Sequence, residues 1–203
     1  MNVNTIISAY YKDKMKDSEP DFRVHGWESE EAVRERYNVL FRAVDLNGKS
    51  LLDAGCGTGA LLDEIKGRKI RCGYLGIDIL PEMVEMARKR RPDGTFLCLD
   101  LSEENPFDRS CFDVVYASGM FNLNTGDNEA FLARMLPMFT EIASECVVFN
   151  LLHERSQNRE EAYFYSSPQA VDRLLKRARI RPRSVEYVDG YRQNDFSVIL
   201  RLS

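Results

Sequence analysis

The chain has 203 residues, of which 44% are hydrophobic and 30% charged, and its formal net charge is −4. This composition argues against a disordered chain and predicts a packed core. No apolar run approaches the roughly 20 residues that span a bilayer. The first residues lack the basic and apolar regions of a signal peptide. We therefore expect a cytoplasmic protein without membrane contact, and the acidic balance disfavours a broad nucleic-acid surface.

The five cysteines give no sign of a disulfide framework or a metal site. They are odd in number and widely spaced, without a C-x-x-C pair, and the sequence has only two histidines. We expect no bound metal and reduced, mostly structural cysteines. Cys98 and Cys146 lie inside apolar runs, where cysteine usually packs as a small core residue.

Two basic stretches stand out against the acidic balance, at residues 88–91 (RKRR) and 176–183 (KRARIRPR). Each is predicted to lie at or just beyond the end of a helix, where cations complement the helix dipole. We interpret both as solvated helix ends rather than nucleic-acid contacts.

The first fifth of the chain is predicted to be helical. The segment 29–32 (SEEA) begins a helix whose apolar residues recur at helical spacing as far as Val44, and 47–48 (NG) marks a turn. Beyond it, short apolar runs alternate with helical patterns. The predicted strands are 50–54, 74–79, 95–99, 112–117, 146–151, 184–188 and 196–202, and the predicted helices are 60–66, 81–90, 128–139 and one that begins at Ser167.

This alternation of strands and helices indicates a parallel sheet wound through right-handed βαβ units. The last two strands are too close for a crossover helix, so we expect them to pair antiparallel at one edge. The predicted fold class is α/β, a Rossmann-like doubly wound sheet. A single domain over residues 1–203 accounts for the chain, with residues 1–47 as an N-terminal helical cap over the active site.

A glycine-rich turn follows the first predicted strand, within residues 51–62 (LLDAGCGTGALL). Gly55, Gly57 and Ala60 satisfy the dinucleotide pattern G-x-G-x-x-G/A, so a nicotinamide enzyme has to be considered. Asp53 discriminates, because a carboxylate aimed at this turn suits an ammonium group and repels a pyrophosphate. The amino acid end of S-adenosylmethionine carries an ammonium group and no phosphate. We therefore favour S-adenosylmethionine over NAD.

Two further aspartates end the second and third predicted strands. Asp78, in the segment 76–79 (GIDI), is suited to accept hydrogen bonds from a ribose diol, a role shared by NAD and S-adenosylmethionine folds. Asp100 is placed to accept from the exocyclic amine of adenine, with Leu101 packed near the ring. A helix cap or a polar loop residue is the structural alternative for Asp100.

Taken in order, the motifs DAGCGTG, GID followed by PEMVEMAR, FLCLDL and FDVVYASG resemble those of the class I S-adenosylmethionine-dependent methyltransferases. The resemblance covers about residues 49–150. It implies S-adenosylmethionine as the cofactor and a seven-stranded sheet of order 3-2-1-4-5-7-6 with strand 7 antiparallel. The cofactor-binding residues that it implies are Asp53, Gly55, Cys56 and Gly57 at the methionine moiety, Asp78 and Ile79 at the ribose, Asp100 and Leu101 at the adenine, and Ser118 at the sulfonium.

The segment after the fourth predicted strand departs from some branches of this family. It is ASGMFNL at residues 117–123, without the N-P-P-[FY] or D-P-P-Y motif usual in enzymes that methylate exocyclic amines of nucleobases. We expect O- or N-methylation of a small molecule by in-line methyl transfer, with a protein side chain as the alternative acceptor and nucleic acid disfavoured. Two other functions stay open: a non-catalytic binder of S-adenosylmethionine or S-adenosylhomocysteine and, more distantly, an NAD-dependent oxidoreductase.

Residues outside the motifs are expected to roof the acceptor pocket. His153 follows a strand at the ligand-facing edge and is the candidate general base, with a surface position as the alternative. Arg34 and Arg36 are candidates to reach the methionine carboxylate, unless they face solvent. The other candidate pocket residues are Tyr10, Tyr11, His25, Trp27, Asn150, Tyr163, Phe164 and Tyr165.

Overall fold

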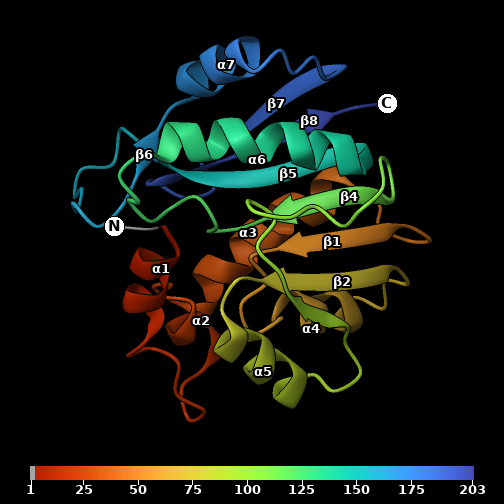
Figure 1. Cartoon of the computed structure of the whole chain (residues 1–203), viewed down its shortest axis with the longest axis vertical. Helices are drawn as coiled ribbons and strands as arrows, with labels where there is room; N and C mark the ends of the chain where they lie inside the picture. Colours follow the sequence, from red (N-terminus) through yellow and green to blue (C-terminus); the bar gives the residue numbers. More distant parts are fainter. Residues whose placement is uncertain (1–2) are drawn as a thin grey trace. The chain divides into compact units, whose positions relative to one another are not determined.

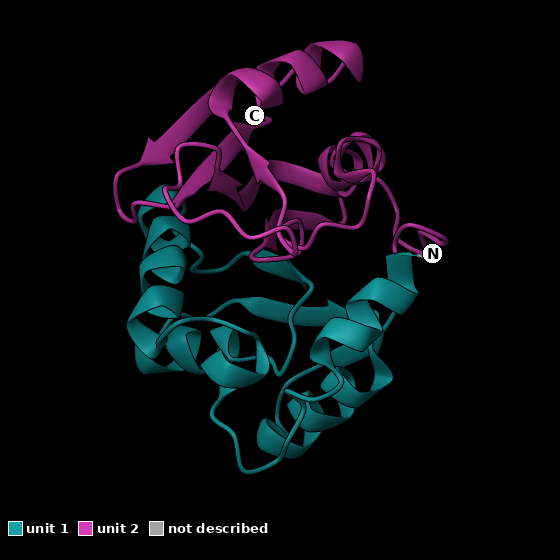
Figure 2. Cartoon of the chain, turned by 90° about the vertical axis from the view of Figure 1, so that its left-hand side faces the viewer, with its two compact units in different colours: residues 1–100 teal, residues 101–203 magenta. Residues whose placement is uncertain are grey.

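The computed structural model describes residues 3–203, which form two compact units, one ending at Asp100 and the other beginning at Leu101 (Figure 2). Each unit contains several strands of sheet with helices packed beside them (Figure 1). The single domain over residues 1–203 and the role of residues 1–47 as a cap stay predictions.

The first unit holds three parallel strands in the order β3-β2-β1. The register pairs Asp53 with Gly76 and Asp78 with Cys98, so the carboxyl ends of the three strands lie at one edge. The elements in chain order are α1 (Val3–Tyr11), α2 (Asp21–Val24), α3 (Glu30–Ala43), β1 (Ser50–Ala54), α4 (Leu61–Gly67), β2 (Gly73–Asp78), α5 (Pro81–Arg90) and β3 (Phe96–Cys98).

The start of α3 confirms the helix predicted from the segment SEEA. Ser29 has extended backbone, and its side-chain oxygen accepts a hydrogen bond from the Ala32 amide at 3.1 Å. This satisfies one of the amides that have no partner within the first turn of a helix. Glu30 and Glu31 occupy the same turn, where negative charge is favoured.

The second unit holds the strand order β4-β5-β8-β7. β4 and β5 are parallel, whereas β8 runs antiparallel to both β5 and β7, and α6 packs against β5 and β4 (Figure 1). The elements are β4 (Phe112–Ala117), α6 (Asn128–Ile142), β5 (Ala143–His153), β6 (Tyr165–Ser166), α7 (Pro168–Arg177), β7 (Ser184–Asp189) and β8 (Asp195–Arg201).

The predicted fold class is confirmed: the structure is a Rossmann-like, mostly parallel α/β fold with an antiparallel β8. The two units reproduce the two halves of the predicted strand order, with the numbering shifted by one after β5. The shift comes from β6, a two-residue strand that pairs with the end of β5 through Leu152–Tyr165 and His153–Ser166. A strand this short has no periodicity that a sequence pattern could show.

The cysteine prediction is right for Cys146 and wrong for Cys98. Cys146 is buried in β5, whereas Cys98 is exposed. Cys98 belongs to β3, the last strand in the order of the first unit, and its neighbour Leu97 is 41% exposed. An apolar run predicted a covered strand, but an outer strand of three residues leaves these side chains open.

The described residues contain neither a membrane-spanning helix nor a cluster of metal-ligating side chains. Over residues 3–203, no helix combines the length and the hydropathy needed to cross a bilayer. In the same part of the chain, no group of three or more His, Cys, Asp or Glu side chains is arranged to hold a metal ion.

Candidate functional site

The glycine-rich loop joins β1 to α4 and adopts a conformation that requires glycine. Gly57 has φ +54°, in the left-handed region that residues with a Cβ rarely adopt. A Cβ at this position would lie 2.4 Å from Nε2 of His25. Gly57 is therefore fixed both by its backbone angle and by the histidine packed against it.

Five consecutive amide groups of this loop, those of residues 55–59, donate hydrogen bonds inside the first unit. The bonds, each 2.9 Å long, are Gly55 and Cys56 to the carbonyl of Ile77, Gly57 to Oδ2 of Asp78, Thr58 to Nε2 of His25, and Gly59 to the carbonyl of Cys56. A loop that binds phosphate offers its amides to the ligand. These five amides already donate to protein acceptors, so an anion bound to them would have to displace those acceptors.

Asp53 at the end of β1 is buried, with 4% of its surface exposed. The Tyr74 hydroxyl donates to Oδ2 of Asp53 at 2.7 Å. Burial raises the pKa of Asp53 to about 7; the negative charge of Asp78 adds to the rise, and the Tyr74 hydrogen bond opposes it. Its charge therefore depends on pH near neutrality.

Asp78 at the end of β2 connects two turns. Its Oδ2 accepts from the Gly57 amide at 2.9 Å, and its Oδ1 accepts from the Leu80 amide at 3.0 Å. Burial raises the pKa of Asp78, and the backbone hydrogen bonds of Leu80, Gly57 and Ile79 oppose that rise. Asp78 thus fixes the glycine loop relative to the start of α5.

Ile79, the next residue, is half-buried beneath the N-terminal helices. It packs on a hydrophobic cluster that joins α2 to α5, together with side chains from α1 and the segment that follows it. The buried members of this cluster are Val24, Leu80, Met83 and Met86, and the partly buried members are Ile7, Tyr11, Met15 and Ile79. Within the first unit, residues from the predicted cap therefore contact the turn after β2.

Helix α2 holds the glycine loop through two residues one turn apart. The Thr58 hydroxyl donates to Oδ1 of Asp21 at 2.5 Å, and the Thr58 amide donates to His25 as described above. Burial lowers the pKa of His25 to about 4; Asp21 opposes this fall, whereas Arg91 and Arg90 add to it. His25 is thus a neutral acceptor at neutral pH.

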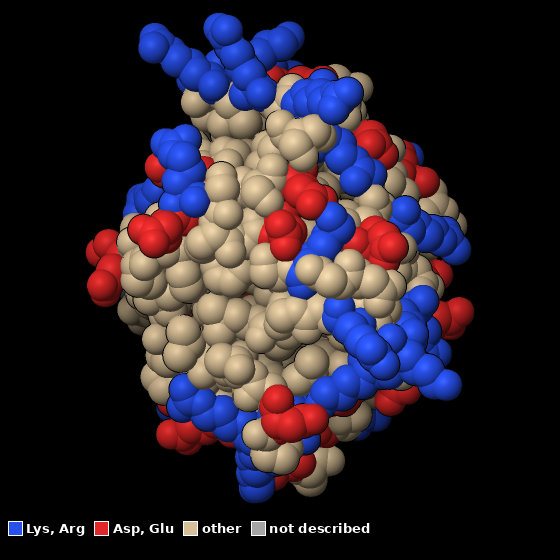
Figure 3. Space-filling model, turned by 90° about the vertical axis from the view of Figure 1, so that its right-hand side faces the viewer, with Lys and Arg blue, Asp and Glu red and all other residues tan. Residues whose placement is uncertain are grey.

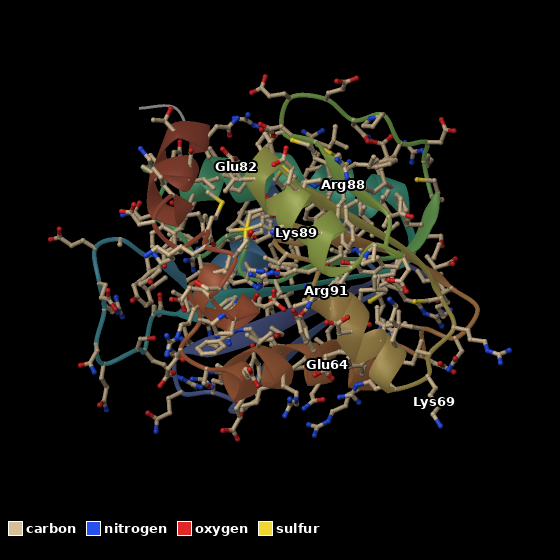
Figure 4. All side chains as sticks on the ribbon, turned by 90° about the horizontal axis from the view of Figure 1, so that it is seen from below. Glu64, Lys69, Glu82, Arg88, Lys89 and Arg91 are labelled. Carbon is tan, nitrogen blue, oxygen red and sulfur yellow. The ribbon has the colours of Figure 1, made fainter. Side chains whose placement is uncertain are left out.

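Two arginines, Arg90 and Arg91, complete this contact between α2 and the loop. Arg91, which follows α5, is labelled in Figure 4. Arg91 binds Oδ2 of Asp21 at 2.6 Å and the Thr58 carbonyl at 2.8 Å, and Arg90 binds Oδ1 of Asp21. Burial by itself would raise the pKa of Asp21. Hydrogen bonds from Arg91, Thr58 and Arg90, together with the positive charge of Arg91, have the larger effect and lower the pKa to about 2. The predicted solvated helix end is therefore wrong for these two arginines, because both pair with Asp21. Asp21 lies about 70 residues away in the sequence, so the contact depends on the fold and has no local sequence signal.

The second basic stretch lies in the other unit and is exposed as predicted. Lys176, Arg177, Arg179, Arg181 and Arg183 are all exposed. Lys and Arg side chains gather at the top of Figure 3, where α7 and the segment after it lie.

Asp100 after β3 contacts a side chain of α1. It is half-buried, and Nδ2 of Asn4 in α1 donates to its Oδ2 at 2.9 Å. The residues at the ends of β1, β2 and β3 therefore contain three carboxylates within the first unit.

Leu101 and Ser118, the other two predicted cofactor residues, belong to the second unit. Leu101 is 3% exposed, and Ser118, which follows β4, is half-buried. Their roles at the cofactor stay predictions.

His153 ends β5 in the second unit, and its side chain is 12% exposed. Its ring packs edge-on against Phe196 with the ring centroids 5.1 Å apart, and its Nδ1 accepts from the Arg155 amide at 3.2 Å. Nε2 lies 3.9 Å from Oδ2 of Asp189. The ring is thus held on both sides, and its role as a general base stays a prediction.

The remaining predicted pocket residues have mixed environments. Trp27 carries the guanidinium of Arg36 over its ring at 3.9 Å, and Arg36 is buried, whereas Arg34 pairs with Glu64 at an exposed position. In the second unit, Asn150 is buried; its Oδ1 accepts from the Gly119 amide at 2.8 Å, and its Nδ2 donates to Asp195 at 2.9 Å.

The contact of Tyr74 with Asp53 was not predicted from the sequence. The register of β1 and β2 pairs Leu51 with Tyr74, which puts Tyr74 on the same sheet face as Asp53, two residues further along. An alternation argument applied to both strands in register could have found this contact, but the register was not known from the sequence.

Comparison with known proteins gives the family. A profile of the methyltransferase domain matches residues 51–140. A methyltransferase-named protein of Mycobacterium tuberculosis is 34% identical over 162 residues, which cover 75% of this chain and 92% of that protein. The chain belongs to the class I S-adenosylmethionine-dependent methyltransferases. This methyltransferase therefore has S-adenosylmethionine as its cofactor.

Two further matches are partial or structural. A malonyl-[acyl-carrier protein] O-methyltransferase of Acetivibrio thermocellus is 36% identical over 89 residues, which cover 41% of this methyltransferase and 31% of that enzyme. The magnesium protoporphyrin IX methyltransferase of Synechocystis, solved with bound S-adenosylmethionine, superposes with a TM-score of 0.70 at 16% identity. That alignment covers 100% of this chain and 98% of the other, and at this identity it supports the fold.

Proposed function

We propose that this methyltransferase transfers a methyl group to an oxygen or nitrogen atom of a small molecule, and that the carboxyl ends of β1, β2 and β3 hold the cofactor. One observation carries the proposed site: the amides of residues 55–59 in the glycine loop already donate hydrogen bonds to the protein, while the neighbouring strands end in carboxylates. A site rich in acceptors favours a cationic ligand group over a pyrophosphate. That preference agrees with the amino acid end of S-adenosylmethionine and opposes NAD.

The proposed contacts follow from the chemistry of each side chain. Asp53 receives the ammonium group, and Asp78 receives the ribose hydroxyls, for which its oxygens retain lone pairs besides the two amide bonds. Asp100 and Leu101 would hold the adenine, and Ser118 would lie at the sulfonium. Because the amides of Gly55, Cys56 and Gly57 are donated internally, we expect these residues to shape the site rather than to donate to the ligand.

The bound cofactor supplies an electrophilic methyl group on its sulfonium. The chain itself has to hold the cofactor, orient the acceptor and exclude water. His153 is the proposed base for a hydroxyl acceptor.

The proposed acceptor class rests on relatives and on the segment after β4. Among the relatives are a malonyl-[acyl-carrier protein] O-methyltransferase, a trans-aconitate 2-methyltransferase and a demethylmenaquinone methyltransferase, which are named for small or carrier-bound acceptors. This chain aligns with 31%, 35% and 39% of the length of these relatives, respectively, so their acceptors support the proposed class and do not identify one substrate. The segment 117–123 also lacks the proline motif of nucleobase N-methylation.

The first test is calorimetric titration with S-adenosylmethionine and, separately, with NAD. We expect micromolar binding of S-adenosylmethionine and none of NAD; NAD binding alone would overturn the proposed site.

The acceptor class is tested with methyl-labelled S-adenosylmethionine and a cell extract. Label in the acid-soluble fraction, or released from precipitate by thioester cleavage, supports a small or carrier-bound acceptor. Label that stays on protein or nucleic acid contradicts it.

A further inference from the structure

Asp53 has one protein hydrogen-bond donor for its carboxylate among residues 3–203, and this donor is uncharged. The Tyr74 hydroxyl donates to Oδ2 at 2.7 Å, and the residue Asp53 is 4% exposed. Asp78, by contrast, accepts from backbone amides on both of its oxygens. The orientation of the Asp53 carboxylate therefore depends on a single side chain.

Tyr74 is itself rigidly placed. Its ring meets Phe96 edge-on, with the centroids 6.0 Å apart, and packs against a buried cluster contributed by the glycine loop, α4, α5 and β3. That cluster consists of Cys56, Leu62, Val84, Ala87 and Phe96. A hydroxyl on a ring fixed in this way holds its acceptor in one orientation, because the ring cannot follow a rotating carboxylate.

We propose that Tyr74 is a positioning residue for binding of the α-ammonium group of the cofactor. Its hydroxyl fixes Oδ2 of Asp53, so that the carboxylate binds the ammonium in one orientation. This inference rests on the proposed role of Asp53. The hydroxyl donates to one carboxylate oxygen and leaves acceptor capacity on the other. The hydroxyl also stabilises the buried Asp53 carboxylate by a hydrogen bond without adding a positive charge, so the ammonium group of the cofactor remains its counter-ion.

The pH dependence of binding follows from the groups that face this pair. Asp78 from β2 and Cys56 from the glycine loop face Asp53, and Tyr37 from α3 faces Tyr74. Burial holds the pKa of Asp53 at about 7, and the Tyr74 hydrogen bond lowers it from a higher value. Removal of the hydroxyl should therefore raise the pH at which Asp53 ionises, and with it the pH at which the ammonium binds well.

The experiment compares two ligands on the full chain and on Tyr74→Phe. S-adenosylhomocysteine carries the amino acid end, whereas 5′-methylthioadenosine lacks it, and both are titrated by calorimetry between pH 6 and pH 9. We expect Tyr74→Phe to weaken S-adenosylhomocysteine about tenfold at pH 7 and to move its binding midpoint to higher pH. The affinity for 5′-methylthioadenosine should stay within about twofold.

Two further variants separate positioning from a loss of structure. Tyr187→Phe removes a matched hydroxyl, which donates to Asp172 at 2.6 Å in the second unit, and it should leave both ligands unaffected. In an Asp53→Asn background, Tyr74→Phe should cause no additional loss for S-adenosylhomocysteine, because the charge it positions is gone.

The outcomes distinguish the two proposals. Equal losses for both ligands in Tyr74→Phe, or an additive loss in the Asp53→Asn background, would overturn the role of Tyr74 while the cofactor site stands. Wild-type affinity for S-adenosylhomocysteine that does not exceed the affinity for 5′-methylthioadenosine would overturn the proposed contact of Asp53, and this inference with it.

Discussion

The ends of β1 and β2 carry the same residue in neighbouring strands, yet the two carboxylates are held in different ways. Asp78 accepts hydrogen bonds from backbone amides on both of its oxygens and connects two turns, whereas Asp53 accepts from one tyrosine hydroxyl. Backbone amides favour the ionised form, and those bonded to Asp78 oppose the rise in its pKa that burial causes. A single neutral donor offsets less, and the pKa of Asp53 stays at about 7. Asp78 is therefore suited to hold structure, and Asp53 to respond to a ligand.

The largest effect should come from Asp78→Ala, which leaves the Gly57 and Leu80 amides without their acceptor. We expect a loss of about 3 kcal/mol in the free energy of unfolding, since each buried amide without a partner costs roughly 1–3 kcal/mol. Urea unfolding followed by circular dichroism measures this loss. Asp45→Ala is the matched control, because Asp45 also accepts an amide two residues ahead, that of Asn47, but at the surface. Equal unfolding midpoints for Asp78→Ala and the wild type would show that Asp78 does not hold the two turns.

Asp53→Asn should affect binding more than folding. We expect the affinity for S-adenosylmethionine at pH 8 to fall about tenfold or more, because a charged hydrogen bond to the ammonium is lost. Calorimetry measures this change. An unchanged affinity would remove Asp53 from the site and erase the contrast with Asp78.

The same variant tests the raised pKa of Asp53 through stability. In the folded state Asp53 keeps its proton up to about pH 7, whereas in the unfolded state it loses the proton at about pH 4. The contribution of this group to stability is therefore complete below pH 4 and is lost as the pH rises to 7. Relative to Asp53→Asn, the wild type should lose stability over this window by up to about 1.4 kcal/mol per pH unit. Parallel stability curves for the two proteins would contradict the shift.

His25→Gln tests whether α2 holds the glycine loop independently of Asp78. The pKa of His25 is about 4 in the folded chain and 6.5 in the unfolded chain, so its contribution to stability is present above pH 6.5 and is lost as the pH falls towards 4. Glutamine keeps an acceptor for the Thr58 amide and does not titrate. We expect the wild type to lose stability relative to His25→Gln between pH 6.5 and 4 in thermal unfolding, and an equal pH dependence would refute this.

The smallest effect should come from Asp100→Asn. Asp100 is half-buried, and its contact with Asn4 is a side-chain hydrogen bond near the surface. We expect the unfolding free energy to change by less than about 0.5 kcal/mol and the affinity for S-adenosylhomocysteine to fall only about two- to fivefold. A loss as large as that of Asp53→Asn would mean that the adenine end dominates binding.

The sequence predicted much of the fold because its signals are local. The helix predicted to begin in the segment 29–32 is present as α3, and every predicted strand is present, with boundaries that differ by a few residues. The two-residue β6 escaped prediction because it has no periodicity. The basic residues 88–91 show the limit of local reasoning: they end a helix as predicted, but Arg90 and Arg91 pair with Asp21, far away in the sequence.

The amino-acid sequence by itself determined the family, the cofactor and the candidate carboxylates Asp53, Asp78 and Asp100, because glycines and aspartates at fixed offsets from strand ends carry that information. Only the tertiary structure decided how each carboxylate is held. Strand register brought Tyr74 to Asp53, and the fold brought Asp21 of α2, and His25 directly after that helix, to Thr58. These partners come from segments about 20 to 40 residues apart, and hydrogen bonds between such segments depend on packing, which leaves no local pattern in the chain.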